Sequence, residues 1–147
     1  MPELPGAVLF SCSMNAVRSP MAEALLKHLL GHRIYVDSVG VRRGVTDGFA
    51  IEVMDEIGLD ISKHRPKTFE DLEDTSFDLI VSLSPEAQHQ AVELTRTMAC
   101  EVEFWNTFDP TLAEGNRETR LAAYRQVRDF LRRRIEARFT LDLKPVV

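Results

Sequence analysis

The chain has 147 residues, of which 44% are hydrophobic and 28% charged, so length and composition fit one globular domain with one core. Its formal net charge of −5 argues against a nucleic-acid partner or an acidic membrane surface, since either needs a positive surface. Two cysteines are too few for a disulfide scaffold, and no apolar run is long enough for a signal peptide or a membrane span, so we expect a cytoplasmic protein.

Short apolar runs alternate along the chain with stretches of helical periodicity. The apolar runs predict four strands: Gly6–Cys12, Arg33–Gly40, Phe77–Ser84 and Cys100–Asn106. The periodic stretches predict four helices, over Ser19–Gly31, Thr46–Gly58, Pro85–Met98 and Arg117–Ala137. The polar segment 63–76 predicts a loop with one short helix, and 107–116 predicts a loop.

Two Ser-Pro pairs, at 19–20 and 84–85, predict helix N-caps followed by a first helical residue. The alternation of strands and helices predicts an α/β fold of three layers, a four-stranded parallel sheet with helices on both faces, in a flavodoxin-like or Rossmann-like arrangement. We expect a single domain over residues 1–147. Ligands of such folds bind beyond the carboxyl ends of the strands, where the loop after Cys12 lies.

The segment from Cys12 to Ser19, CSMNAVRS, combines a thiol with features that bind anions. Between a strand and a helix, its backbone N–H groups can surround an anion, and the helix N-terminus adds partial positive charge. Arg18 can bind two phosphate oxygens, and the same field stabilises a Cys12 thiolate, to which Ser19 could donate. These groups fit nucleophilic attack on a phosphate monoester.

Such attack needs an acid that protonates the leaving oxygen. Asp109 belongs to the only Asp-Pro pair of the chain and follows the fourth predicted strand. In a parallel sheet this loop lies at the same edge as Cys12, and Pro110 keeps Asp109 out of a helix. We therefore predict that Asp109 is the general acid.

The segment CSMNAVRSPMAEA resembles the active-site loop of the low-molecular-weight protein tyrosine phosphatases. The segments DSVG, GLDISKHRPK, FDLIVSLS and FDPT follow in the order of that family, so the resemblance covers nearly the whole chain. The late Asp-Pro and the position of the cysteine after the first strand make this resemblance specific.

The resemblance implies a phosphocysteine on Cys12, phosphate binding and transition-state stabilisation by Arg18, a lower thiol pKa through Ser19, and general acid and then base catalysis by Asp109. It implies phosphate binding by the loop, namely Ser13, Met14, Asn15, Ala16, Val17 and Arg18. Asn15 would shape the loop through hydrogen bonds to Ser38 and His64. No metal and no organic cofactor would be needed, and the substrate would be a phosphorylated protein or a small phosphate monoester.

The chain departs from the family at four places. Met14 replaces a glycine, which means either a different loop shape or a negative φ at this position. Val17 replaces a common second cysteine, so a protective disulfide with the nucleophile is not expected. Thr111 and Leu112 stand where eukaryotic members have tyrosines, so the pattern is bacterial-type. Two arginines, Arg42 and Arg43, replace an aromatic substrate wall and could contact an acidic substrate.

The other notable residues have simpler structural interpretations. Cys100, Phe104 and Trp105 belong to a predicted buried strand, and we expect core packing, with Trp105 as a lesser candidate for the site. The arginines of the last helix are interleaved with acids and predict a solvated face. We expect three histidines at the surface, and no metal-ligand spacing is present: His28, His32 and His89.

Three functional hypotheses remain. The first is a cysteine-dependent phosphatase acting on phosphotyrosine or another phosphate monoester. The second is an arsenate reductase, which shares the fold and loop but passes oxidation to two further cysteines, where this chain has only Cys100. The third is a non-catalytic phosphate-binding module, which only Met14 suggests.

Overall fold

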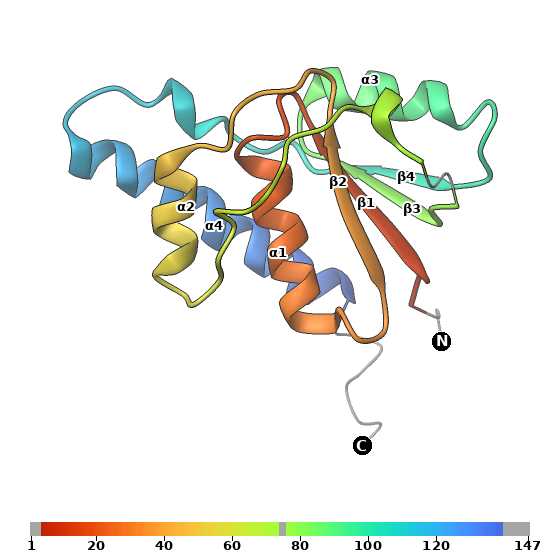
Figure 1. The fold of residues 1–147 in the computed structure, drawn as a ribbon, viewed down its shortest axis with the longest axis horizontal. Helices are drawn as coiled ribbons and strands as arrows, with labels where there is room; N and C mark the ends of the chain where they lie inside the picture. The colour runs from red at the N-terminus through yellow and green to blue at the C-terminus, as the bar shows by residue number, and fades with distance from the viewer. Residues whose placement is uncertain (1–3, 74–75, 140–147) are drawn as a thin grey trace.

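The computed structural model describes residues 4–73 and 76–139. Its centre is a sheet of four parallel strands in the order β2-β1-β3-β4 (Figure 1). The predicted α/β architecture is therefore confirmed. Each strand is shorter than the apolar run that predicted it, because the ladder ends where a neighbouring strand ends: β1 Ala7–Cys12, β2 Tyr35–Gly40, β3 Leu79–Ser82 and β4 Glu101–Phe104.

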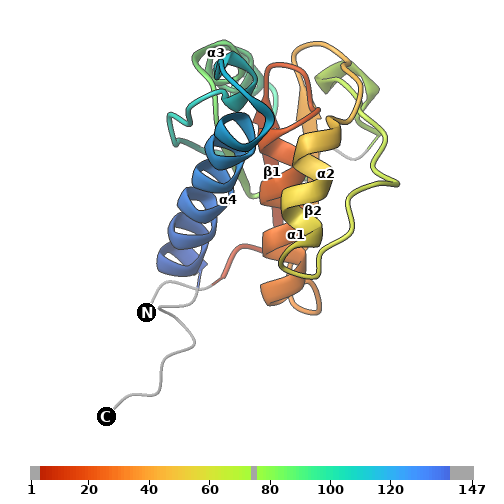
Figure 2. The same ribbon diagram turned by 90° about the vertical axis from the view of Figure 1, so that its left-hand side faces the viewer.

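Four helices cover the two faces of this sheet. Helix α3 packs on one face, whereas α1 and α4 pack together on the other, with α2 against α4 (Figures 1 and 2). Two 3-10 helices lie in the connections, at Phe69–Asp71 and Pro110–Leu112, and the first is the short helix expected within segment 63–76. The bounds of the main helices are α1 Arg18–Leu30, α2 Gly48–Asp55, α3 Pro85–Leu94 and α4 Arg117–Phe139.

Alternate residues of the central strand β1 serve the two halves of the core. Val8, Phe10 and Cys12 face the larger apolar cluster, which includes the buried sides of α1, α2 and α4. Leu9 faces the smaller cluster, together with Ala91 of α3. This two-residue period is that of a strand buried on both faces, and it turns Cys12 toward α1 at the carboxyl end of β1.

Only one of the two predicted serine N-caps is an N-cap. Ser84 has an extended backbone, and its hydroxyl accepts from the N–H of Ala87 at 3.2 Å. Ser19 is instead the second residue of α1, whose N-cap is Val17 without any side-chain bond. The N-cap prediction at Ser19 was wrong because its hydroxyl lies against the Cys12 thiol. The helix predicted from Thr46 begins at Gly48 instead, with Asp47 as its N-cap.

Two packing predictions near the C-terminal half are corrected. Trp105 is buried as expected, but Phe104 is 42% exposed, because β4 is an edge strand of the sheet. Helix α4 is not an entirely solvated arginine face, since Arg128 is buried and donates to the carbonyl of Val53 and the carboxylate of Glu56. The three predicted surface histidines, His28, His32 and His89, are exposed.

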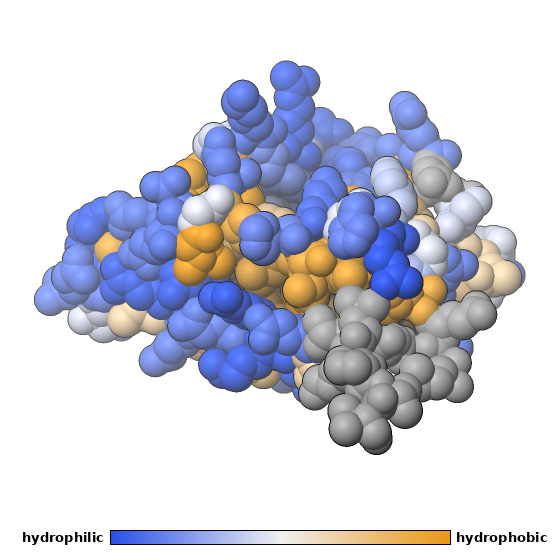
Figure 3. All heavy atoms as spheres, turned by 90° about the horizontal axis from the view of Figure 1, so that it is seen from below, coloured by the Kyte–Doolittle hydropathy of each residue, from blue (hydrophilic) through white to orange (hydrophobic). Residues whose placement is uncertain are grey.

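The face at the amino ends of the strands is largely covered by hydrophilic side chains, with an apolar band between them (Figure 3). Within 4–73 and 76–139, no helix has both the length and the apolar character to cross a membrane. The loops described next lie at the opposite face, at the carboxyl ends of the strands (Figure 1).

Candidate active site

The loop of residues 13–17 joins the end of β1 to the start of α1 and holds the Cys12 thiol at its base. Cys12 is 2% exposed, and its Sγ lies 3.0 Å from Ser19 Oγ. A hydroxyl at this distance can donate to a thiolate. Cys12 and Ser19 therefore stand in the relation that the sequence predicted, although Ser19 reaches the thiol from inside the helix.

The carbonyl groups of this loop point outward, toward the segment 41–47. The carbonyls of Cys12, Ser13, Met14 and Ala16 accept backbone N–H groups from 41, 42, 44 and 47 at 2.8–3.1 Å. The N–H groups of 13–17 have no acceptor in the described part of the chain. A loop with its carbonyls held outside presents its N–H groups inward, which is the geometry of an anion-binding nest.

Gly40 permits the close approach of this loop to the end of β2. A Cβ there would lie 2.6 Å from the backbone N of Asn15 and 2.8 Å from the carbonyl carbon of Met14. A side chain would therefore displace the anion-binding loop. This requirement explains the glycine of the segment DSVG.

The side chain of Asn15 forms the hydrogen bonds that hold the loop in place. Its φ is +54°, in the left-handed region that asparagine tolerates better than most residues. Its Nδ2 donates to Ser19 Oγ at 2.8 Å and Ser38 Oγ at 3.0 Å. Its Oδ1 accepts from the backbone N–H of Lys67 and lies 3.0 Å from Nε2 of His64. The structure thus brings Asn15, Ser38 and His64 together as the resemblance implied.

Met14 and Val17, the two departures inside the loop, fit it without distortion. Among the described non-glycine residues only Asn15 has a positive φ, so Met14 needs no glycine-like backbone. Its side chain is 40% exposed at the rim. Val17 is buried in the larger apolar cluster. Of the two alternatives for Met14, the structure has the one without a positive φ.

Arg18 links the Cys12 loop to the loop after β4. It is 8% exposed, donates from Nη1 to the carbonyl of Thr107 at 3.1 Å, and places Nη2 3.9 Å from Asp109 Oδ2. Asp109 caps the second 3-10 helix, because its Oδ1 accepts from the N–H and the hydroxyl of Thr111. Its Oδ2 is left on the side of Arg18.

One cavity of about 190 Å³ joins these groups. No aromatic side chain lines it within the described residues, and its walls include Cys12, Ala16, Arg18, Val45, Asp47 and Asp109. Ser13 lies beside it, with its hydroxyl donating to Ser84 Oγ at 3.1 Å. A thiol, a guanidinium and a carboxyl group thus face one space that a phosphate group can enter.

Arg42 and Arg43 do not line this cavity. Arg42 pairs with both carboxylate oxygens of Glu86, and Arg43 pairs with Asp71 at 2.7 Å. Hydrogen bonds from the backbone N–H of Thr68 and then from Arg43 lower the pKa of Asp71 to about 2. Both arginines are thus paired within the protein, and their contact with an acidic substrate stays a prediction.

Sequence reasoning missed Glu23, which lies behind the loop network. Its Oε1 accepts from Ser38 Oγ at 2.5 Å and lies 3.9 Å from Nδ1 of His64, while Lys27 bonds Oε2. Burial lowers the pKa of His64, and the charge of Glu23 opposes this. In the sequence, Glu23 and Lys27 have the i, i+4 spacing of an ordinary ion pair on a helix surface, so nothing there indicated that Glu23 contacts Ser38 and His64.

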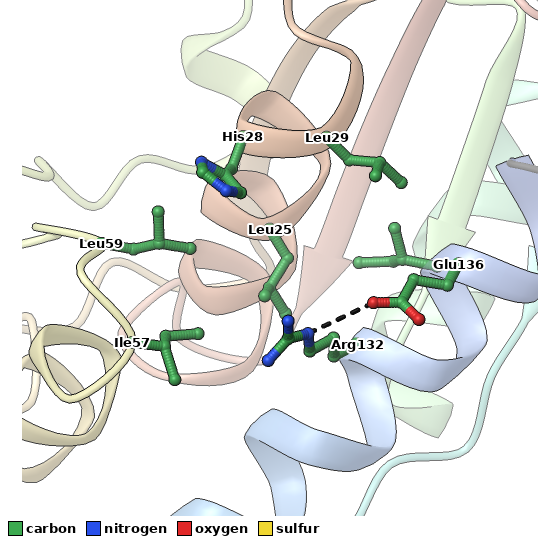
Figure 4. Close-up of a pocket in the computed structure, with 8 residues that line it drawn as sticks. Leu25, His28, Leu29, Ile57, Leu59, Arg132 and Glu136 are labelled. Carbon is green, nitrogen blue, oxygen red and sulfur yellow. Dashed lines mark hydrogen bonds and ion pairs between the residues drawn. The ribbon is translucent and has the colours of Figure 1, made fainter.

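A second cavity of equal volume lies near the other end of α1 (Figure 4). Leu25, Leu29 and Ile57 give it apolar walls, and Arg132 bonds to Glu136 across its mouth. No cysteine is among the described residues that line it. Within the described ranges no group of three metal-ligating side chains is present.

Cys100 is far from this site. It is partly buried and packs against the smaller apolar cluster, and burial raises its pKa. The following residue, Glu101, bonds to Asp78, which bonds to Ala7 at the amino end of β1. Cys12 lies at the other end of that strand, about 17 Å from Ala7 at ~3.3 Å per residue, so the length of β1 separates the two thiols.

Comparisons with known proteins support this arrangement. Residues 7–140 match the family model described as low molecular weight phosphotyrosine protein phosphatase. An arsenate reductase of Halalkalibacterium halodurans is 33% identical over 129 residues, which cover 88% of this chain and 91% of that protein.

Two solved structures have the same fold. An arsenate reductase in a phosphate-binding state is 28% identical, with a TM-score of 0.71 over 92% of this chain and 97% of the other. The Erwinia amylovora tyrosine phosphatase AmsI is 19% identical, with a TM-score of 0.72 over 92% of each chain. With the family model matching most of its length, this chain belongs to the low molecular weight phosphotyrosine protein phosphatase family.

Proposed function

We propose that the protein hydrolyses phosphate monoesters through a phosphocysteine intermediate on Cys12. The observation that carries the proposal is that Cys12, Arg18 and Asp109 line one cavity. The inward N–H groups of 13–17 fit the remaining requirement, which is a cradle for the phosphate oxygens. The substrate is a phosphorylated protein or a small phosphate monoester.

In the first step the Cys12 thiolate attacks phosphorus, and the bond from phosphorus to the leaving oxygen breaks. Asp109, in its carboxylic acid form, gives its proton to that oxygen. Arg18 and the loop N–H groups bind the three other phosphate oxygens, on which charge is spread in the transition state. The products of this step are the free alcohol or phenol and phosphocysteine.

In the second step a water molecule attacks phosphorus, and the phosphorus–sulfur bond breaks. The Asp109 carboxylate takes a proton from the water, which regenerates the acid for the next turnover. Ser19 donates a hydrogen bond to the departing thiolate, for which its distance of 3.0 Å is suitable. Inorganic phosphate is released, so the net reaction is hydrolysis of the ester.

Arsenate reduction is the second candidate, because curated relatives with that name are about one third identical to this chain. Reduction of arsenate to arsenite takes two electrons, which two thiols supply as they become a disulfide. Cys100 cannot pair with Cys12 without refolding, since a disulfide requires Cα atoms within about 7 Å. Arsenate reduction by this protein therefore needs an external thiol such as glutathione.

The only observation that favoured a non-catalytic binding module was Met14, and Met14 has no positive φ that would require a glycine. The loop carbonyls stay paired, and the nucleophile, the arginine and the carboxyl group are all present at the cavity. The phosphatase is therefore the function that the geometry supports best.

The deciding experiment is hydrolysis of an aryl phosphate near pH 5.5 without metal. The wild type and Cys100→Ser should both turn over, whereas Cys12→Ser should not, although it should still bind phosphate. Parallel assays with arsenate and glutathione would test the reductase. Arsenate reduction without ester hydrolysis would overturn the proposal, and so would hydrolysis that survives Cys12→Ser.

A further inference from the structure

A wider groove of about 600 Å³, distinct from the cavity of Figure 4, lies beside the cavity of Cys12. The two share Val45 and Asp47 as walls, and Phe49, Arg117 and Arg120 also line the groove. Val45 is 86% exposed between them. A substrate whose phosphate lies at Cys12 can therefore continue over Val45 into this groove.

The carboxylates of the groove are already engaged by the protein. Asp47 accepts the hydroxyl of Tyr124 at 2.8 Å and the N–H of Phe49 at 2.8 Å. Glu52 pairs with Arg117, which also lies 3.6 Å from Glu118. Asp47 keeps its charge, because both of its donors are neutral, but among the described residues it forms no ion pair with Arg120, and Glu52 is paired with Arg117.

The remaining cation of the groove is Arg120. Its guanidinium carbon lies 4.8 Å from the centre of the Phe49 ring, and no carboxylate lies within ion-pair distance of it among the described residues. Phe49 is itself held edge-to-face against the buried Tyr124, with ring centres 5.4 Å apart. A guanidinium over an aromatic ring can still donate its N–H groups to a carboxylate.

We propose that this groove is a subsite for an acidic side chain of a peptide or protein substrate, and that Arg120 binds its carboxylate. The proposal rests on the function proposed above and names the substrate class of that site. An extended peptide advances ~3.3 Å per residue. Because the groove and cavity share a wall, we expect the acidic residue within about three positions of the phosphorylated one.

The test uses phosphotyrosine peptides in which one glutamate or one glutamine is moved through the three positions on either side. The readout is the ratio of kcat/KM between the glutamate and glutamine peptides, in which any general effect of a substitution cancels. In the wild type we expect about a two- to fivefold preference for glutamate at one or two positions, which is the upper part of the range of an exposed ion pair. The preference should shrink with added salt.

In Arg120→Gln the ratio should fall to about one, and Arg120→Lys should restore part of it. The matched control is Arg132→Gln, which removes the same charge from the same helix about 18 Å away, at 1.5 Å per residue, and should keep the ratio. A wild-type ratio of one at all positions would overturn the subsite, and so would a preference that Arg120→Gln leaves intact.

The same peptides should also be titrated against Cys12→Ser, which separates binding from turnover. If the wild type hydrolyses no ester but Cys12→Ser still prefers glutamate peptides in an Arg120-dependent way, the subsite stands and the proposed function fails. If the wild type hydrolyses the peptides without preference, the function stands and the subsite fails.

Discussion

The two loops that meet at the cavity of Cys12 are held in place very differently. The Cys12 loop has its carbonyls bonded to segment 41–47 and its central side chain, Asn15, fully buried in a polar network. In the Asp109 loop, the carboxylate bonds only within its own turn, and Phe108 and Leu112 on either side are 58% and 69% exposed. Arg18 joins the two loops through its hydrogen bond to the carbonyl of Thr107 and its ion pair with Asp109 at 3.9 Å.

This difference separates two requirements of the reaction. The nucleophile and its anion cradle must be rigid before the substrate arrives, because their value lies in preorganisation. A general acid has to follow the leaving oxygen of whichever substrate binds, so a locally capped loop is sufficient. We therefore expect substitutions in the Cys12 loop to reduce stability and rate together, and substitutions at Asp109 to reduce the rate alone.

The largest combined effect is expected for Asn15→Ala. It removes the partners of four groups, and an unsatisfied buried group costs about 1–3 kcal/mol, so the free energy of unfolding should fall by about 2–4 kcal/mol. Displacement of the loop should also lower kcat/KM by about a hundredfold or more. Urea unfolding and aryl phosphate turnover measure the two losses.

Asn15→Gly is the matched control, because glycine accepts the φ of +54° without a Cβ. It should be more stable than Asn15→Ala while remaining slow, which separates backbone strain from the lost amide. Wild-type turnover in either variant would show that this network does not position the thiol.

The second prediction concerns Asp109→Asn. Loss of the acid should lower kcat by about 10²–10⁴ for alkyl phosphates, and by less for aryl phosphates, whose leaving groups need less protonation. Asparagine can still accept from Thr111, so the free energy of unfolding should change by no more than about 0.5 kcal/mol.

Thr111→Val serves as the control for Asp109→Asn, since it removes one bond to the carboxylate but leaves the acid in place. Its rate should stay much closer to that of the wild type for both ester classes. An equal loss for alkyl and aryl esters in Asp109→Asn would exclude proton donation as the role of Asp109.

Much of the Cys12 loop could be predicted from sequence because its contacts are local. Cys12, Asn15 and Ser19 lie within eight residues, and a strand followed by a helix brings them together. The same local reasoning failed at the helix start. Ser19-Pro20 and Ser84-Pro85 are identical pairs, yet only Ser84 has the extended backbone of an N-cap. Pro20 fits inside the first turn, where its missing N–H is not needed.

The contacts that sequence could not predict join residues distant in the chain. Arg18 reaches the Thr107 carbonyl across 89 positions, and Tyr124 reaches Asp47 across 77. A backbone carbonyl has no sequence signature, and a tyrosine on an apolar stripe predicts only packing. The burial of Arg128 could not be predicted for the same reason, since its partner Glu56 is distant in the chain, just after the end of α2.

The third prediction tests whether support for the Cys12 loop extends to α4. Tyr124→Phe removes the bond to Asp47, whose own N–H holds the carbonyl of Ala16. The free energy of unfolding should fall by about 0.5–1.5 kcal/mol. Catalytic efficiency should fall less than tenfold, since the backbone bond remains.

The exposed Tyr35 offers the matched control, because Tyr35→Phe makes the same change where the side chain is 53% exposed. It should leave both quantities as in the wild type. If Tyr124→Phe costs stability but no activity, α4 supports the fold and not the loop.

The smallest effect is expected in the pH dependence of stability. Burial lowers the pKa of His64 in the folded protein below its ordinary value of 6.5. At a pH between the lowered pKa and 6.5, the imidazole is therefore protonated in the unfolded chain and neutral in the folded protein. The free energy of unfolding should therefore be highest above pH 6.5 and should fall as the pH drops through the lowered pKa. Glu56, whose pKa of about 2 reflects its bonds to Arg125 and Arg128, loses its contribution only below about pH 4.5.

Urea unfolding between pH 7.5 and 5.5 should therefore isolate His64 from that carboxyl group. His64→Gln should flatten the slope, whereas His32→Gln, which removes an exposed histidine, should retain it. A slope of the opposite sign would mean that the nearby carboxylate of Glu23, 3.9 Å from Nδ1, outweighs burial and keeps the imidazole charged. The polar network behind the Cys12 loop would then be an ion pair, and acid would strengthen rather than weaken the support of the nucleophile.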